Sequence, residues 1–127
     1  GYIGYDLEGA KAEAAAYEAA TGKPLAFTLS GHDSVEQAQI QQSLVAMWKE
    51  AGIDVTVRAT DQGGVILNSA VGDFEAMEFR NFGSIDPDAD MFFLLSGDLE
   101  STVSLNFPRF FDEEVDSAVL LVCLDDR

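Results

Sequence analysis

The chain has 127 residues, enough for one ordinary domain whose core needs neither a disulfide nor a metal. Its 23 acidic residues outnumber its 7 basic ones, and the resulting net charge of −16 repels phosphate backbones and anionic lipid surfaces. Nucleic acid is therefore excluded as an expected partner. No apolar run approaches the roughly 20 residues that cross a bilayer, so no membrane insertion is expected. Cys123 is the only cysteine, which excludes an internal disulfide and a cysteine zinc cluster.

The first elements have clear start and stop signals. Residues 6–21 are rich in alanine, begin with Asp6 as a capping residue and stop before Gly22, which predicts a helix. Residues 25–29 are apolar and bounded by turn formers, so a short buried strand is expected there.

The second helix has the strongest pattern. It starts at a capping box, in which the Ser34 hydroxyl and the Gln37 side chain are each expected to satisfy a backbone donor, and it stops before Gly52. Its expected core face carries apolar residues at helical spacing: Ile40, Leu44, Met47, Trp48 and Ala51. Gln41 is placed on the opposite, solvent-facing side.

The rest of the chain continues the alternation of strands and helices. The expected elements are a strand at 53–59, a helix at 65–71, a strand at 74–79, a short helix at 91–95 and a helix at 115–124. Strands that alternate with helices of this length imply right-handed crossovers and a parallel sheet. The predicted fold class is α/β, a three-layer lobe whose mainly parallel mixed sheet is covered by helices, and residues 1–127 form a single lobe.

Three stretches carry a family pattern. They are Tyr-Asp-Leu-Glu-Gly-Ala-Lys at 5–11, Met-Trp-Lys-Glu-Ala-Gly-Ile-Asp-Val at 47–55 and Val-Gly-Asp-Phe-Glu-Ala at 71–76. In this order and spacing the chain resembles the extracellular solute-binding proteins (family 5) of dipeptide and oligopeptide ABC importers. The resemblance continues through residues 81–84 and 86–88, where members often carry a Gly-Trp-Gly type loop and an acidic segment with proline.

The resemblance implies a structure and a function. Family members are two-lobed and longer than this chain, so the chain is expected to be most of the second lobe, with a periplasmic-binding-protein type II-like fold. The implied partners are a peptide or similar small solute held between the lobes, the first lobe of the same protein and an ABC permease. The implied location is periplasmic or extracellular, as a lipoprotein or a secreted protein. No cofactor and no catalytic activity are expected.

The loop after the third expected strand is the predicted ligand-binding segment, because ligands of open α/β sheets bind beyond the carboxyl ends of the strands. Its residues are Asn81, Phe82, Gly83, Ser84, Ile85 and Asp86. The resemblance matches Phe82 to an aromatic that packs against ligand. An ungapped comparison places Ile85 where many peptide binders carry an aspartate for the ligand's α-amine, and Asp86 takes that place if the loop is shifted by one residue. A buried amine without a carboxylate costs several kcal/mol, which leaves open whether a peptide amine binds.

Two arginines near strand ends, Arg58 and Arg80, are further candidates, since a guanidinium fork can hold a ligand carboxylate. In so acidic a chain the alternative is that each pairs with a nearby acid. Ser30, His32 and Asp33 supply the residue types of a hydrolytic triad, but neighbours in one loop rarely reach the required geometry. His32 is therefore interpreted as a loop residue, and no enzyme is predicted.

A second function remains open. The chain is alternatively a stand-alone α/β protein-interaction domain derived from such a lobe. It would pair with itself or another protein through an exposed apolar surface that includes Phe107, Phe110 and Phe111.

Overall fold

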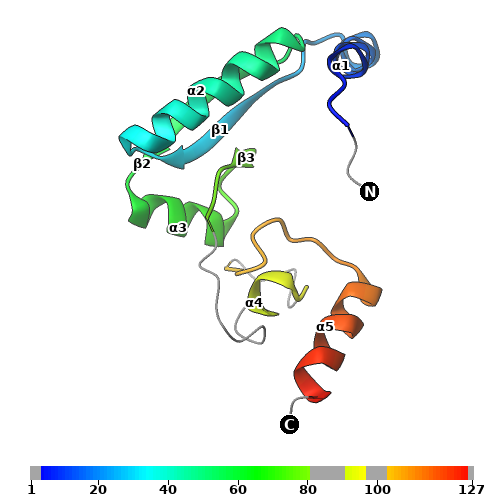
Figure 1. Ribbon diagram of the computed structural model, residues 1–127, viewed down its shortest axis with the longest axis vertical. Helices are drawn as coiled ribbons and strands as arrows, with labels where there is room; N and C mark the ends of the chain where they lie inside the picture. Colours follow the sequence, from blue (N-terminus) through cyan, green and yellow to red (C-terminus); the bar gives the residue numbers. More distant parts are fainter. Residues whose placement is uncertain (1–3, 81–90, 97–102, 126–127) are drawn as a thin grey trace. The chain divides into compact units, whose positions relative to one another are not determined.

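The computed structural model of the protein describes residues 4–80, 91–96 and 103–125 (Figure 1). In chain order its elements are α1 Leu7–Thr21, β1 Ala26–His32, α2 Val35–Glu50, β2 Asp54–Thr60, α3 Gln62–Val71, β3 Ala76–Met77, α4 Met91–Leu94 and α5 Glu113–Asp125. The predicted alternation of helices and strands is confirmed. The chain divides into two compact units, unit 1 with Gly1–Gln62 and Glu75–Glu78, and unit 2 with Gly63–Phe74 and Phe79–Arg127.

Unit 1 is built on a three-stranded parallel sheet in the order β2-β1-β3. Leu29 in the central strand β1 is aligned with Val57 of β2 and with Ala76 of β3. A parallel neighbour requires a crossover connection, and α2 supplies it between β1 and β2. The predicted α/β class with a parallel sheet is therefore confirmed.

The strand lengths differ from expectation. β1 continues to His32, because its pairing with β2 persists as far as the His32 and Thr60 pair. β3 is shorter than expected, and side-chain and loop bonds extend its contact with β1. Glu75 Oε2 accepts from the Thr28 backbone N–H at 2.6 Å, and the Glu78 N–H donates to the Ser30 carbonyl at 2.9 Å.

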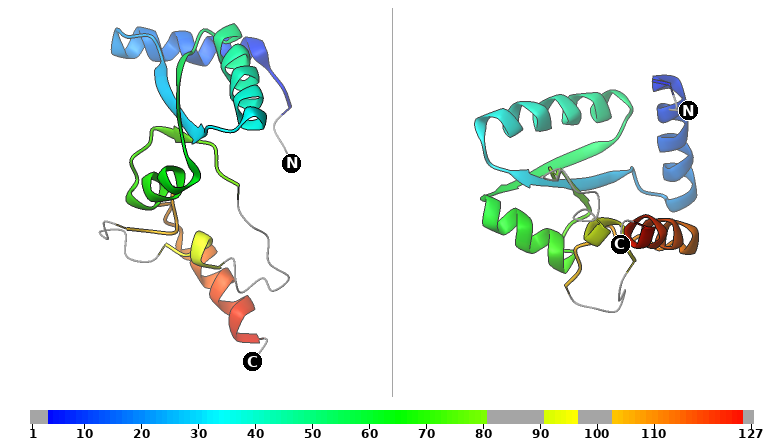
Figure 2. Two further views of the ribbon diagram at one scale, coloured as in Figure 1. Left: turned by 90° about the vertical axis from the view of Figure 1, so that its left-hand side faces the viewer. Right: turned by 60° about the horizontal axis from the view of Figure 1, so that its bottom comes forward.

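The helix α2 lies along β1 and β2 (Figures 1 and 2). The Trp48 ring packs edge-on against Phe27 of β1, with ring centroids 5.2 Å apart. Leu29, two residues after Phe27 in β1 and so on the same face of the sheet, is 3% exposed. Such an aromatic pair stabilises by about 0.5–1.5 kcal/mol beyond its buried area, so Trp48 acts as the expected core residue.

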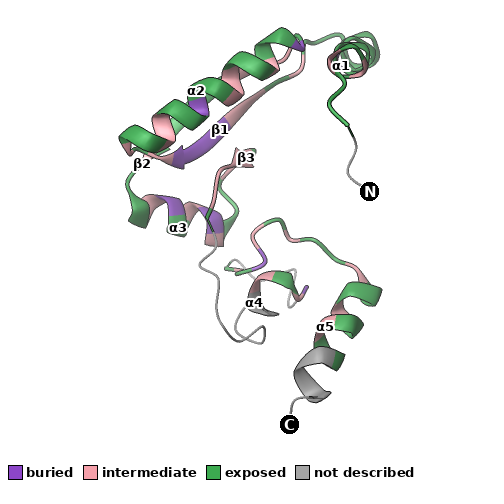
Figure 3. Ribbon diagram, viewed as in Figure 1, coloured by how far each residue is buried: buried purple, intermediate pink, exposed green. Residues whose placement is uncertain are grey.

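The inward face of α2 was predicted wrongly in part. Gln41 is 3% exposed, whereas Ile40 and Met47 are 48% and 53% exposed. Gln41 and Trp48 are separated by two helical turns and so lie on one side of the helix. Ile40 and Met47 each precede one of them by a single residue, which turns them about 100° away. Figure 3 shows how small the buried part of α2 is.

Unit 2 is organised around a buried asparagine. Asn106 is 3% exposed, and its amide Nδ2 donates to the carbonyls of Leu95 and Phe110 at 3.2 and 2.7 Å. Its Oδ1 accepts from the Phe110 N–H at 3.3 Å. Nearby, Asp116 of α5 accepts from both the backbone N–H and the hydroxyl of Ser96 at 3.0 Å. These bonds connect α4, the segment before α5, and α5 itself.

The phenylalanines of unit 2 divide into two groups. Phe107 packs edge-on against Phe79 and Phe93, with centroids 4.8 and 5.8 Å apart, and is half-buried. Phe110 and Phe111 are each 55% exposed. Of the three phenylalanines expected at an exposed apolar surface, Phe110 and Phe111 are exposed, while Phe107 is packed within the unit.

Among the residues that the structure describes, no helix is both long and apolar enough to span a membrane.

Candidate functional site

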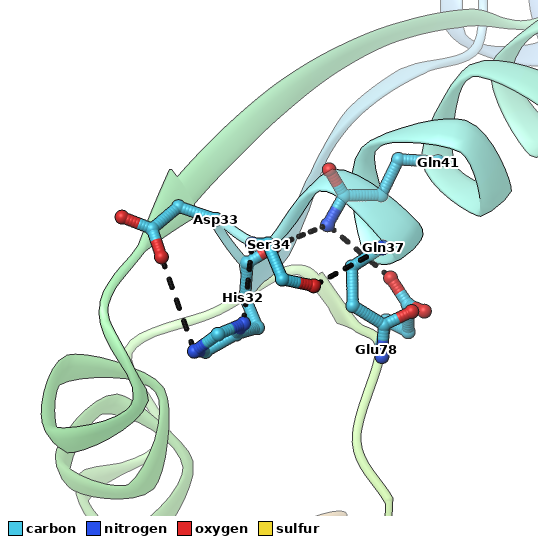
Figure 4. A network of polar contacts seen from close by, with 6 residues as sticks. All are labelled: His32, Asp33, Ser34, Gln37, Gln41 and Glu78. Atoms are coloured by element: carbon cyan, nitrogen blue, oxygen red, sulfur yellow. Dashed lines mark hydrogen bonds and ion pairs between the residues drawn. The ribbon is translucent and has the colours of Figure 1, made fainter.

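Polar side chains gather where β1 and β3 end. We name this group the sheet-end cluster, and Figure 4 shows its members: His32, Asp33, Ser34, Gln37, Gln41 and Glu78. Backbone bonds fix their positions, because the Asp33 N–H donates to the carbonyl of Thr60, the last residue of β2, at 2.9 Å. The cluster therefore lies at the carboxyl end of a parallel sheet, the edge where open α/β proteins bind ligands.

The buried Gln41 side chain holds the cluster together. Its Nε2 donates to the His32 carbonyl and to Glu78 Oε2, both at 3.2 Å, and so joins β1 to the residue that follows β3. Gly31 makes room for this amide, because a Cβ atom there would lie 2.5 Å from Gln41 Nε2 and 3.2 Å from Glu78 Oε2. Burial of a glutamine is tolerated because its donors are paired.

The expected capping box forms only in part. The Ser34 hydroxyl accepts from the Gln37 N–H at 3.2 Å, as predicted. The Ser34 N–H, however, donates to His32 Nδ1 at 3.2 Å. His32 thus takes the place that the Gln37 side chain would have as the acceptor of this N–H in a full capping box. The Gln37 Oε1 atom is left buried without a hydrogen-bond partner in the described structure.

His32 is the last residue of β1, so its interpretation as a loop residue was wrong. Its Nδ1 accepts a backbone hydrogen bond, which places the proton of the neutral ring on Nε2. That atom lies 3.9 Å from Asp33 Oδ1. The Ser30 hydroxyl accepts from Arg58 Nε at 3.1 Å. These three residues therefore serve separate structural contacts, and their geometry is not that of a triad.

The predicted ligand loop follows directly after the described segment. Asn81, Phe82, Gly83, Ser84, Ile85 and Asp86 all lie outside the described residues, so their role stays a prediction. Arg80, the residue before them, is exposed.

Arg58 is exposed on β2, and its Nε donates to the Ser30 hydroxyl at 3.1 Å. It lies near Glu75, whose pKa is held below its ordinary value mainly by the Thr28 hydrogen bonds and further by the Arg58 charge. This proximity favours the alternative interpretation, in which Arg58 balances a nearby acid. Within the described ranges, no three metal-ligating side chains gather in one place.

The sequence missed the two central members of the cluster. Gln41 was placed on the solvent side, and Glu78 was read only as part of a strand. The available signal was the spacing of Gln37 and Gln41, which stand one turn apart on the same helix face as Trp48. An acid just past a strand end is a weaker signal, because such positions are often solvated.

An open parallel sheet with polar side chains beyond its carboxyl ends defines an α/β arrangement suited to ligand binding. No protein-family model matches the chain, and no curated protein matches it. Solved structures do match.

Three of these structures illustrate the likeness. The Escherichia coli murein tripeptide binding protein MppA shares 24% identity over 92% of this chain and 23% of its own, with a TM-score of 0.70. NikZ from Campylobacter jejuni, in complex with Ni(L-His), shares 17% sequence identity over 94% of this chain and 26% of its own, with a TM-score of 0.73. The periplasmic binding protein DppA from Helicobacter pylori, in complex with the peptide STSA, shares 17% sequence identity over 92% of this chain and 23% of its own, with a TM-score of 0.69.

The resemblance seen in the sequence is thereby confirmed for the fold. The neighbours are periplasmic binding proteins of ABC transporters, peptide binders among them, and the chain has the fold of one part of them. The chain spans 23 to 26% of the length of the three proteins compared. These neighbours are transport proteins and not enzymes.

Proposed function

We propose that the chain is one lobe of the substrate-binding component of an ABC importer and that it holds a peptide or similar small solute. The loop at residues 81–86 supplies contacts to the ligand in this lobe's half of the site. The first lobe of the same protein closes over the ligand, and the ABC permease receives it. The observation that carries this proposal is the shared fold, which covers 92% of the chain in a tripeptide-binding protein.

We also propose that the protein catalyses no reaction and that it is located in the periplasm or outside the cell. Ser30, His32 and Asp33 each serve a structural contact, and the solved structures that share this fold act in transport. Lobe closure around a ligand needs no activated nucleophile, because binding and release depend on a hinge and on contacts made in the closed state.

The neighbours also limit how far the ligand can be specified. One structure holds a peptide and another holds nickel with L-histidine, although both have this fold. Ligand identity therefore depends on particular side chains and not on the backbone arrangement.

Ligand-induced stabilisation of the gene product that contains this chain tests the proposal. Pools of di- to pentapeptides are added, and the free energy of unfolding is measured by denaturant titration. A ligand at about 100 times its Kd stabilises the folded state by about 2.7 kcal/mol. We expect at least one pool to stabilise the protein and Phe82→Ala to reduce the effect.

Phe110→Ala is the matched control, because this phenylalanine is 55% exposed and lies outside the proposed site. It should leave ligand-induced stabilisation intact. The proposal is overturned when neither peptides nor other small solutes stabilise the protein. It is equally overturned when the purified chain hydrolyses peptide or ester substrates and His32→Ala abolishes that activity.

A further inference from the structure

Glu78 is a half-buried carboxylate that no protein cation neutralises within the described ranges. It directly follows β3, and the hydrogen bond that it receives comes from the neutral amide of Gln41. Only one oxygen, Oε2, is engaged in this bond. Partial removal from water disfavours a charged carboxylate, and a nearby positive charge would stabilise it.

This carboxylate is held in a fixed position. Gln41 donates its two amide hydrogens to the His32 carbonyl and to Glu78, and Gln41 is 3% exposed. The Glu78 backbone N–H donates to the Ser30 carbonyl at 2.9 Å, which anchors the residue at its main chain as well. Because both ends are fixed, the second carboxylate oxygen is presented in a defined direction, as a binding group requires.

A second acceptor without a donor lies in the same cluster. Gln37 stands one helical turn before Gln41 on the same face of α2, and its buried Oε1 has no partner in the described structure. Figure 4 shows the side chains of Gln37, Gln41 and Glu78 turned towards the same region. Leaving such an oxygen unpaired costs free energy, so a donor from outside the cluster is favoured.

No other member of the cluster donates a hydrogen bond to that oxygen. His32 Nδ1 already accepts from Ser34, and its Nε2 lies near Asp33. Asp33 adds another acid and no hydrogen to donate. The cluster therefore has two oxygens that receive no hydrogen bond in the described structure, Oε1 of Glu78 and Oε1 of Gln37, and a group with several N–H donors and a positive charge complements them.

We propose that the sheet-end cluster is a cation subsite, in which Glu78 and the Gln37 amide oxygen together receive an ammonium or guanidinium group of the transported solute. This inference rests on the proposed function and narrows its substrate class to solutes with an organic cation. An ammonium offers three donors and a guanidinium five, which suits two acceptors on different elements. Hydrogen bonds between charged partners are the stronger kind, so a preference of about tenfold or more is expected.

Three probes of similar size test the subsite on the gene product that contains this chain. Acetyl-Ala-Met-Ala has no cation, acetyl-Ala-Lys-Ala has a side-chain ammonium, and Ala-Met-Ala has a terminal ammonium. Binding to each is measured by isothermal titration calorimetry with the unchanged protein, with Glu78→Gln and with Glu36→Gln. Glu36 is an exposed acid in the first turn of α2, so this control removes the same charge outside the cluster.

The expected result is that one cationic probe binds at least about tenfold more tightly than acetyl-Ala-Met-Ala. Glu78→Gln should abolish this preference and Glu36→Gln should retain it. The tighter of the two cationic probes identifies whether the ammonium comes from a side chain or from a peptide terminus.

Other outcomes overturn the inference. If the neutral probe binds as well as both cationic probes, or if Glu78→Gln keeps the preference, the subsite is wrong while the transport function stands. If none of the three probes binds, the peptide-binding function fails and the subsite fails with it.

A measurement on the unchanged protein covers the case in which Glu78→Gln does not fold. Between about 0.01 and about 1 M salt the screening length falls from about 30 to about 3 Å. The preference for a cationic probe should shrink over this range, and a preference that does not depend on salt contradicts the subsite.

Discussion

Glu75 replaces a backbone carbonyl in the contact between β1 and β3. Its Oε2 accepts from the Thr28 N–H at 2.6 Å, and this bond is the main reason that the pKa of its carboxyl lies below the ordinary value. The nearby Arg58 charge lowers this pKa further. A hydrogen bond to an ionised carboxylate stabilises the charged form, and the charged form in turn stabilises the folded sheet.

This coupling predicts a loss of stability in acid. Because the folded pKa of Glu75 is lowered, its contribution is fully present above the ordinary glutamate pKa of about 4.3. That contribution is lost as the pH falls through the lower, folded value. Glu75→Gln should flatten this part of the pH dependence in urea denaturation. Glu13→Gln, an exposed change in α1, should keep the slope of the unchanged protein, and an unaltered slope in Glu75→Gln would falsify the assignment.

Gly31 is a second position where one atom decides the local structure. Gly31→Ala would place a Cβ 2.5 Å from Gln41 Nε2, and overpacking of this kind costs about 1–3 kcal/mol. We expect a lower urea midpoint for this variant. Gly4→Ala is the control, since no atom lies within 4 Å of a Cβ there, and equal effects of the two substitutions would contradict the close contact.

These side-chain details were only partly accessible from the sequence. Periodicity correctly assigned Trp48 to the core but could not place Gln41, because an apolar pattern gives no reason to bury an amide. The reason lies in tertiary contacts, namely the His32 carbonyl and the Glu78 carboxylate that the fold brings to it. Such contacts depend on strand register, which the sequence does not state.

The helices were the best predicted elements because their termini have local signals. Asp6 accepts from the Gly9 N–H at 2.8 Å at the start of α1, and Gly22 ends that helix with a left-handed φ of 70°. At α5, Asp112 accepts from the Glu114 and Val115 N–H groups. The strands were predicted less accurately, because their ends depend on pairing partners far away in the sequence, as the short β3 shows.

The N-cap of α2 gives a test of this local logic. Ser34→Ala removes the hydroxyl that accepts from the Gln37 N–H and should destabilise the protein by about 1 kcal/mol. Ser34→Thr should retain most of that stability. Ser43→Ala removes a hydroxyl from the exposed middle of the same helix and should be close to neutral, as measured by thermal unfolding. A neutral Ser34→Ala would show that the cap does not contribute.

For the molecule as a whole, the fold class was predictable and the ligand was not. The alternation of helices and strands is a property of the entire chain, so errors at single residues such as Ile40 did not disturb it. The proposed ligand loop at residues 81–86 has no comparable periodicity. Its function would depend on a few side chains, and the match of Ile85 or Asp86 to an amine-pairing acid changes with a shift of one residue.

The exposed phenylalanines lead to a prediction about association. Phe110 and Phe111 are adjacent and each 55% exposed, which leaves apolar surface available to another molecule. The isolated chain is expected to self-associate with increasing concentration in sedimentation equilibrium. The double change Phe110→Ser and Phe111→Ser should weaken this association, whereas Val35→Ser, at a site that is 79% exposed, should not. A chain that remains monomeric at all concentrations would contradict this prediction.

The order β2-β1-β3 also determines how fast backbone hydrogens exchange with solvent. β1 is bonded to a neighbour on each side, while β2 is bonded to β1 along one side only in the described sheet. Successive N–H groups of a strand point in opposite directions within the sheet. Deuterium should therefore enter β2 at alternate residues first, whereas the residues of β1 that pair with both neighbours, Leu29 and Ser30, should exchange last.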